Sequence, residues 1–362
     1  MKCRAHILRD VPEPLTSKHW QELTFRRIRE TPALAHGLGA FTTVRHHPDG
    51  YIYCGTTAFD NDILYRFDRT SSRFESLRYE TVAELFEAKV HRSLEMDTDG
   101  KFFGATACLH DLDDRHLAPG GSLFAFDPAS GRIHKMAIPV PFDYIQNITL
   151  DRQRRKICGC TYPVAEFFCY DLATGETIRR QYIGSTPHQL ALDDNGRVWG
   201  TWGASNFLFA YELDADAFHF TRIPLPGLER TDTGALDGAV NGGDGYLYMG
   251  TVQGALVRID PRNPDAPVVE FLGKPLPKWR MPAIVCGPDG LLYIVGGGEH
   301  DVHIVAFDRK IRRFSDLGHV MDTRTGVTCY MPHDLALTPD GAAYVGETDH
   351  PVRSGYLWEC VL

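Results

Sequence analysis

The segment DGYIYCGT at residues 49–56, followed by LYRFD at residues 64–68, has the pattern of short antiparallel strands. The Asp-Gly pair at its start accepts the positive φ values of a two-residue hairpin turn, so one strand should end before it and another begin after it. The residues after the turn alternate between the two faces of a strand, and the second segment is an aromatic strand that ends in an acid. The stretch therefore predicts at least three consecutive strands of one antiparallel sheet.

The same pattern returns along the whole chain, at intervals of about 50 residues, the spacing typical of propeller blades. The later copies lie at residues 99–104 with 123–127, 157–161 with 168–171, 195–201 with 208–212, 244–251 with 256–260, 289–296 with 304–308, and 340–348 with 356–359. A weaker fourth strand follows, as in FESL at 74–77 and FSDL at 314–317. Small sheets that cannot bury both faces alone do so by packing radially against each other. We therefore predict an all-β fold, a seven-bladed β-propeller with four-stranded antiparallel blades, as a single domain over residues 1–362.

The ends of the chain predict how the propeller closes. The last copy ends at Leu362, at its third strand, and so lacks a fourth. Residues 23–29, LTFRRIR, alternate like an outer strand. The N-terminal strand, at residues 23–30, should therefore complete the last blade, with residues 1–22 as an N-terminal extension.

Composition and charge limit the classes of partner. The net charge of -9 argues against general binding of nucleic acid or of anionic membranes. No apolar run approaches the length of a membrane helix, and the first residues lack the apolar core of a signal peptide, so we expect a cytoplasmic protein. The nine cysteines mostly lie in apolar strand-like runs, which is typical of reduced, buried thiols. A small-molecule or oligosaccharide substrate is expected, bound by a monomer or a dimer.

The residues that open the first strand of each blade should surround the central channel. In chain order they are His91 with Arg92, Tyr144 and Gln146, His188, Asp237, Arg280 with Met281, and His333. His188 and His333 open closely matching stretches, HQLAL and HDLAL. Each histidine taken alone is typical of a structural residue that caps a strand. Converging imidazoles and a carboxylate instead suit a divalent metal (Ca²⁺, Mn²⁺ or Mg²⁺) or acid–base catalysis near neutral pH.

Further polar and aromatic candidates lie at the ends of second strands. Glu347 follows His333 by 14 positions, and Arg353 lies in the next loop. Glu347 would be a metal ligand or would orient His333, and a solvated polar loop is the alternative. Trp202 would stack on a sugar or pack between blades. The insertion at residues 108–121 would be a substrate lid, a Ca²⁺ loop or, more simply, a solvated surface loop, since its spacing does not match a calcium-loop pattern.

The repeats resemble those of seven-bladed propellers among carbohydrate lyases, namely oligogalacturonate lyases and the lyases that release L-rhamnose from an α-1,4-linked glucuronate. The stretch GETD at residues 346–349, together with RSGYLWE at residues 353–359, is similar to the second group. The spacing of His333 and Glu347 resembles that of virginiamycin B lyase, in which such a pair acts with Mg²⁺. A weaker similarity is to the metal-dependent gluconolactonase group, whose acidic metal ligands are not evident here.

These similarities imply a lyase that cleaves a uronic-acid-containing oligosaccharide, such as a rhamnosyl-glucuronate, by β-elimination in the central channel. The reaction needs a cation to neutralise the uronate carboxylate, a base and an acid. The cation would be Arg92, Arg280, or a metal held by His188, His333 and Glu347; the base His91 or His333; the acid Tyr144 or Tyr330. Gln146, Asp237, Trp202 and Arg353 would bind substrate. A metal-dependent lactonase or ester hydrolase and a non-catalytic protein-interaction propeller are the alternatives.

Overall fold

The protein is a seven-bladed β-propeller, as the repeats predict. The computed structural model describes residues 1–11, 22–226, 234–277 and 280–362. Strands dominate these residues and form seven sheets, six with four strands and one enlarged by two short strands. Neighbouring strands of the sheets pair antiparallel. Chain order and sheet order agree except where β1 joins the last sheet and where β6 and β9 join the sheet of blade one.

The strands of blades one to four follow the repeats closely. Blade one contains β2 (Gly39–His46), β3 (Ile52–Ala58), β4 (Leu64–Asp68) and β5 (Arg73–Ser76), extended by β6 (Glu87–Lys89) and β9 (Ala107–Cys108). Blade two contains β7 (Leu94–Met96), β8 (Phe102–Ala105), β10 (Leu123–Asp127) and β11 (Arg132–Ala137). Blade three contains β12 (Tyr144–Asp151), β13 (Lys156–Tyr162), β14 (Glu166–Asp171) and β15 (Glu176–Tyr182). Blade four contains β16 (Ala191–Leu192), β17 (Arg197–Trp202), β18 (Phe207–Glu212) and β19 (Ala217–Pro224).

The remaining blades have the same plan. Blade five contains β20 (Leu236–Asn241), β21 (Leu247–Thr251), β22 (Leu256–Asp260) and β23 (Val268–Gly273). Blade six contains β24 (Ala283–Cys286), β25 (Leu292–Gly298), β26 (Asp301–Asp308) and β27 (Arg313–His319). Blade seven contains β28 (Met331–Leu337), β29 (Ala342–Thr348), β30 (Leu357–Val361) and β1 (Lys2–His6). The helices described are short: α1 (Phe25–Glu30), α2 (Pro32–Gly37) and two 3₁₀ turns, η2 (Tyr79–Thr81) and η3 (Leu112–Leu117).

Neighbouring blades bury apolar side chains against each other. The residue before the acid that ends each third strand is a core residue, as at Phe67, Phe126, Tyr211 and Phe307, all at most 2% exposed. Separate apolar clusters lie between blades seven and one, one and two, three and four, four and five, and five and six. The aromatic strand of the repeat therefore buries the face of the next blade, which a small sheet cannot bury by itself.

The chain divides into two compact units. One contains Met1–Gln146 and Val320–Leu362, and the other contains Asn147–His319. Blades seven, one and two belong to the first unit. Blades four, five and six belong to the second unit.

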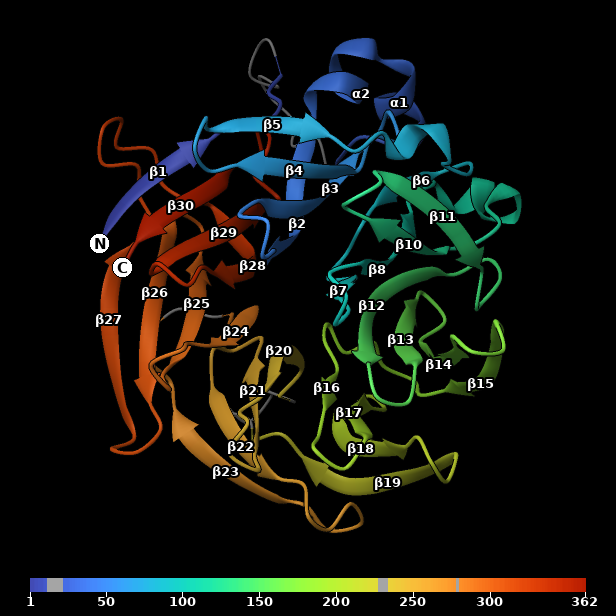
Figure 1. Ribbon diagram of the computed structural model, residues 1–362, viewed down its shortest axis with the longest axis vertical. Helices are drawn as coiled ribbons and strands as arrows, with labels where there is room; N and C mark the ends of the chain where they lie inside the picture. The colour runs from blue at the N-terminus through green and yellow to red at the C-terminus, as the bar shows by residue number, and fades with distance from the viewer. Residues whose placement is uncertain (12–21, 227–233, 278–279) are drawn as a thin grey trace. The chain divides into compact units, whose positions relative to one another are not determined.

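The strand that completes blade seven is N-terminal, but it is not the predicted one. β1 pairs antiparallel with β30 from Lys2 opposite Val361 to His6 opposite Leu357, so the two ends of the chain lie side by side (Figure 1). The prediction of a closing strand at residues 23–30 was wrong, because Phe25–Glu30 form helix α1. The Thr24 side chain accepts a hydrogen bond from the Arg27 backbone N–H, which is an N-cap that favours a helix over a strand.

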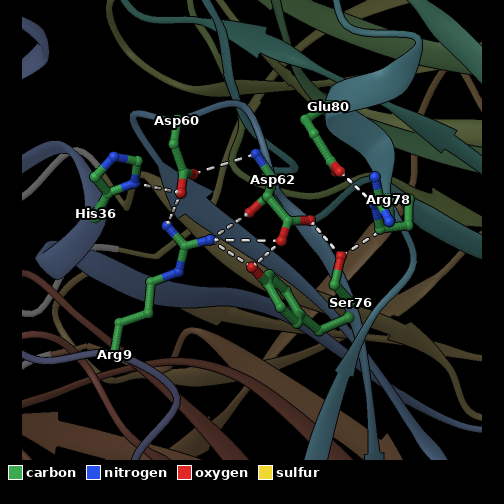
Figure 2. Close-up of polar contacts among 8 residues, drawn as sticks. Arg9, His36, Asp60, Asp62, Ser76, Arg78 and Glu80 are labelled. Carbon is green, nitrogen blue, oxygen red and sulfur yellow. Dashed lines mark hydrogen bonds and ion pairs between the residues drawn. The ribbon is translucent and has the colours of Figure 1, made fainter.

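Beyond β1 the chain is fastened to blade one by a polar cluster around Arg9 (Figure 2). The Arg9 guanidinium donates to the Asp60 carboxylate at 2.7 Å and contacts the Tyr65 hydroxyl. His36 Nδ1 lies 3.3 Å from the same Asp60 carboxylate. Asp62 lies on the other side of the guanidinium, 3.6 Å from it. These contacts join the N-terminal segment, α2 and the β3–β4 loop.

The insertion at residues 108–121 packs on the N-terminal segment. Its Asp111 carboxylate accepts hydrogen bonds from the backbone N–H groups of Phe25 and Arg26, at 2.9 and 3.0 Å. Asp114 in η3 forms an ion pair with Arg26. The insertion therefore binds α1 through two hydrogen bonds and an ion pair.

Among the described residues, no helix has both the length and the apolar character needed to cross a membrane.

Candidate functional site

Most of the predicted site residues lie at or just before the first strands of their blades, whereas Trp202, Glu347 and Arg353 lie on or after second strands. They form two groups that belong to different units. His91, Arg92, Tyr144, Gln146, Tyr330, His333, Glu347 and Arg353 belong to the first unit, and His188, Trp202, Asp237 and Arg280 belong to the second. Each group has its own geometry.

In the first unit, two of the predicted histidines are in direct contact. His91 Nδ1 lies 2.5 Å from the backbone carbonyl oxygen of Gln146, and His91 Nε2 lies 2.9 Å from His333 Nε2. A carbonyl only accepts, so Nδ1 of His91 carries the proton and its Nε2 accepts from the N–H of His333. The rings are perpendicular, at 86°, and both residues are buried, at 6% and 4% exposed. Gln146 thus contacts His91 through its backbone carbonyl and not through its side-chain amide.

Arg92 follows in an unusual backbone conformation. Its φ is +46°, in the left-handed region that a bulky residue rarely adopts, and the residue is buried. Its backbone N–H donates to the Thr42 carbonyl at 3.3 Å. Arg280 in the second unit shares the feature, with φ of +77° and its N–H on the Val252 carbonyl at 3.0 Å. Strained backbone at two predicted site positions is consistent with a functional constraint.

In the second unit, His188, Asp237 and Arg280 form a hydrogen-bonded triad. His188 Nδ1 lies 3.0 Å from Asp237 Oδ1. The Arg280 guanidinium donates to both carboxylate oxygens of Asp237, at 3.1 and 3.2 Å. The Asp237 side chain is fully buried, the Arg280 side chain is 14% exposed, and the His188 side chain is 37% exposed.

The triad gives His188 a defined chemistry. A carboxylate that accepts from Nδ1–H fixes the imidazole tautomer, leaves Nε2 with its lone pair, and stabilises the imidazolium that forms when Nε2 takes a proton. The sequence predicted that Asp237 binds substrate and that Arg280 neutralises the carboxylate of the substrate. In the structure, the two side chains are hydrogen-bonded to each other. Their pairing has no sequence signal, because 43 residues separate them.

Glu347 is enclosed by hydrogen-bond donors of its own blade. Its carboxylate, fully buried, accepts from both terminal nitrogens of Arg353, at 2.9 and 2.8 Å. It also accepts from the backbone N–H groups of Tyr330 and Tyr356 and from the indole N–H of Trp358, at 2.7, 2.8 and 3.1 Å. These five bonds use the roughly four lone-pair sites of a carboxylate.

Tyr356, whose backbone binds Glu347, also forms a hydrogen bond through its side chain. Burial raises the pKa of Tyr356 to about 12, so its phenol stays protonated and donates to Asp10 at 3.0 Å.

The aromatic candidates have mainly packing contacts. Trp202 donates its indole N–H to the Thr221 carbonyl at 3.1 Å and packs against the rings of Phe207 and Phe220. The Tyr330 ring contacts the His350 ring edge-on, with centroids 5.2 Å apart. Tyr144 begins β12 and is half-buried. Their roles toward a substrate stay predictions.

The metal also stays a prediction. The described part of the chain contains no cluster of three or more His, Cys, Asp or Glu side chains arranged to hold an ion. His333 is bonded to His91, His188 to Asp237 and Glu347 to Arg353, so each predicted ligand has at least one protein partner.

Sequence reasoning missed Lys89 and Asp349, which line a pocket of the first unit. Lys89 lies two positions before His91 and Asp349 two positions after Glu347. Their closeness in sequence to His91 and Glu347 is the signal that could have identified them as residues near the predicted site.

Comparisons with known proteins show the fold. No protein-family model and no curated protein sequence matches the chain. A streptogramin B lyase structure is 15% identical, with a TM-score of 0.64, and the match covers 88% of this chain and 92% of that one. A catalytically inactive variant of virginiamycin B lyase from Staphylococcus aureus, solved with quinupristin, is 13% identical, with a TM-score of 0.67 over 100% and 99% of the chains. The WD40 repeats of RRP9 are 11% identical, with a TM-score of 0.62 over 97% and 99%. At such identities, a likeness to lyases and to WD40 propellers alike establishes that this chain is a seven-bladed β-propeller.

Proposed function

We propose that the protein is a lyase that cleaves a uronic-acid-containing oligosaccharide by β-elimination, with His188 as the base. The single observation that carries the proposal is the His188–Asp237–Arg280 triad. It presents a partly exposed imidazole, oriented by a buried carboxylate, just before the first strand of blade four. This arrangement suits removal of a proton near neutral pH.

The base is assigned to His188 on the basis of access. His91 and His333 were the sequence candidates, but they are nearly buried and bonded to each other. A base must come within hydrogen-bond reach of the proton that it removes, which favours the 37% exposed ring of His188. Asp237 acts through His188 as a positioning residue, and Arg280 holds Asp237.

The reaction balances as an elimination. Nε2 of His188 takes the proton from C5 of the uronate, the electrons of that bond form a C4–C5 double bond, and the C4–O bond breaks. The leaving oxygen takes a proton from a general acid, which completes the elimination. The uronate carboxylate needs a cation to acidify C5, and Arg280, which belongs to the same unit as His188 and is bonded to Asp237, is the candidate.

The test is a screen of uronate oligosaccharides, including rhamnosyl-glucuronates, for products whose conjugated double bond absorbs in the ultraviolet. His188→Ala should lower kcat by about 100-fold or more, because general base catalysis contributes at least that factor. Asp237→Asn should also lower kcat and shift the pH profile, because the tautomer of His188 is no longer fixed.

The matched control is His303→Ala. His303 also pairs with a carboxylate, at 2.9 Å from Asp316, but it lies on β26, the third strand of blade six. This variant should keep wild-type activity. Near-wild-type activity of His188→Ala would remove His188 from the mechanism. Cleavage without an unsaturated product would overturn the elimination and favour a hydrolase.

A further inference from the structure

Two of the buried cysteines lie directly opposite each other where the ends of the chain meet. In the pairing of β1 with β30, Cys3 is the partner of Cys360. Directly opposed residues of an antiparallel pair have Cα atoms about 4.5–5.5 Å apart and side chains on the same face of the sheet. A disulfide spans Cα–Cα distances of about 4.4–6.8 Å. The backbone therefore already holds the two thiols at the separation that a disulfide needs.

The two sulfurs also interact in the reduced protein. A hydrogen bond with Cys360 lowers the pKa of Cys3, and a hydrogen bond from the Met321 backbone N–H acts in the same direction, against the effect of burial. The hydrogen bond with Cys3 raises the pKa of Cys360 well above its usual value. Cys3 thus has the thiolate character, and the thiol of Cys360 donates to it. A thiolate beside a second thiol is the arrangement of a redox-sensitive cysteine and its resolving partner.

A second pair of cysteines has the same backbone geometry in a different place. Cys158 on β13 and Cys169 on β14 are also directly opposite each other. These are the two inner strands of blade three, and burial raises the pKa of Cys158 well above its usual value. Cys3, in contrast, lies on the outer strand of blade seven, next to the end of the chain. Chain ends open at a lower free energy than inner strands do, so an oxidant should reach Cys3 first.

We propose that Cys3 and Cys360 are a site of reversible oxidation, at which a disulfide locks the closing strand β1 to the last blade. The inference is independent of the lyase reaction, because both cysteines belong to the first unit and His188 belongs to the second.

Hydrogen peroxide is the oxidant that balances the reaction. The Cys3 thiolate attacks one peroxide oxygen, an S–O bond forms, the O–O bond breaks, and the leaving hydroxide takes a proton to become water. The sulfur of Cys360 then attacks the sulfur of Cys3, the S–S bond forms, and the S–O bond breaks. The hydroxyl group leaves as water with the proton of Cys360. The two thiols lose two electrons, which the peroxide gains, and a dithiol such as dithiothreitol reverses the oxidation by thiol–disulfide exchange.

The disulfide would join residues close to the two ends of the chain, so it would enclose almost the whole sequence. A cross-link that closes a long loop restricts the unfolded chain more than one that closes a short loop. We expect oxidation to raise the melting temperature by about 4–8 °C, the shift that corresponds to the typical stabilisation by a disulfide in a protein of this size.

The test uses the full chain with Cys286→Ser, which removes the exposed thiol. The folded protein is treated with hydrogen peroxide, its remaining thiols are alkylated in denaturant, and its peptides are identified by mass spectrometry without reductant. The expected product joins the peptide of Cys3 to the peptide of Cys360, and two of the eight buried thiols escape alkylation. Dithiothreitol should restore both thiols and the original melting temperature.

Serine variants in the same background assign the two roles. Cys360→Ser should leave a sulfenic acid on Cys3, which dimedone traps. Cys3→Ser should give neither the trapped adduct nor the cross-link. The matched control is Cys158→Ser, which removes the other directly opposed pair and should leave the Cys3–Cys360 cross-link and its melting shift unchanged.

Three results would overturn the proposal. The first is a folded chain that yields no peptide linked through Cys3 and Cys360. The second is a disulfide between Cys158 and Cys169 that forms as fast as the proposed one. The third is a linked protein that melts no higher than the reduced protein. All three readouts come from the chain with its own cysteines at these four positions, so they do not depend on whether a serine variant folds.

Discussion

At the scale of the residue, the fully buried Glu347 carboxylate has a structural role within blade seven. Its removal would leave the Arg353 guanidinium, whose side chain is 13% exposed, without its ion-pair partner. Breaking a buried pair in this way costs about 3–5 kcal/mol. We expect Glu347→Ala to lower the free energy of unfolding by that amount, as measured by urea denaturation.

Glu75→Ala is the control for this change. Glu75 pairs with Arg66 on the surface of blade one, with a side chain that is 47% exposed. Exposed pairs contribute at most about 1 kcal/mol, so the loss should be small. If the two variants had equal midpoints, Glu347 would not have the structural role assigned to it here.

The site could be predicted from the sequence only in part. The repeat placed His333 and Glu347 on adjacent strands, and β28 and β29 do pair with Pro332 opposite Glu347. It also placed His91 and His333 at equivalent positions, and they touch. The donors around Glu347 come from a loop and from β30, and the partner of His188 comes from the next blade. Such contacts depend on the directions of individual side chains, which the spacing of a sequence repeat does not specify.

At the scale of the element, β1 is fixed to blade seven by side chains as well as by strand pairing. His6 Nε2 lies 2.9 Å from Glu359 Oε2 on β30, and the Tyr344 hydroxyl donates to Glu359 Oε1 at 2.8 Å. The hydrogen bond with His6, followed by that from Tyr344, lowers the pKa of Glu359 below its usual 4.5. The ionised carboxylate is therefore preferred in the folded protein.

This pKa makes the closing strand sensitive to acid. A carboxyl group with a lowered folded-state pKa contributes stability above its unfolded pKa, and that contribution is lost as the pH falls through the folded value. We expect the melting temperature to fall as the pH drops below about 4.5, and to fall less steeply in Glu359→Gln. Melts between pH 3 and 7 measure this. Parallel curves for the two proteins would refute the role of Glu359.

The closing strand also shows why an element can escape prediction. The sequence KCRAH at Lys2–His6 has three basic residues and no large apolar one, so it lacks the alternation of a strand. It is held instead by backbone pairing with β30 and by the Asp322 carboxylate, which accepts from the Ala5 N–H at 3.0 Å. Residues 23–29 do alternate, but a capped helix satisfies the same pattern when only Ile28 has to be buried.

At the scale of the whole molecule, the repeat predicted the fold because its turn residues and its aromatic strand have the same structural role in each blade. Gly50, Gly100, Gly245, Gly290 and Gly341 all have positive φ at the turns where the pattern predicts them. The aromatic strands fill the space between neighbouring blades. Turn chemistry and burial are local properties, which explains why seven degenerate copies still specified a propeller.

The same packing determines the reactivity of the thiols. All nine cysteines are free; eight are buried, and Cys286 is exposed. The thiolate is the reactive form, and burial raises the pKa of Cys108 to about 12 and that of Cys54 further. Cys3 differs, because a hydrogen bond with Cys360 lowers its pKa, but it is only 3% exposed, so access limits it.

Burial raises the pKa of Cys286 as well, but its side chain is the exposed one. We therefore expect a thiol reagent such as Ellman's to modify this cysteine faster than the other eight in the native protein at pH 8, and all nine in denaturant. Cys286→Ser should abolish the rapid phase and leave the count in denaturant one lower. A rapid phase that survives in Cys286→Ser would mean that a blade opens often enough to expose a buried thiol. If Cys3 were then the residue labelled, the opening would lie at the β1–β30 pair, where the N-terminal strand completes the last blade.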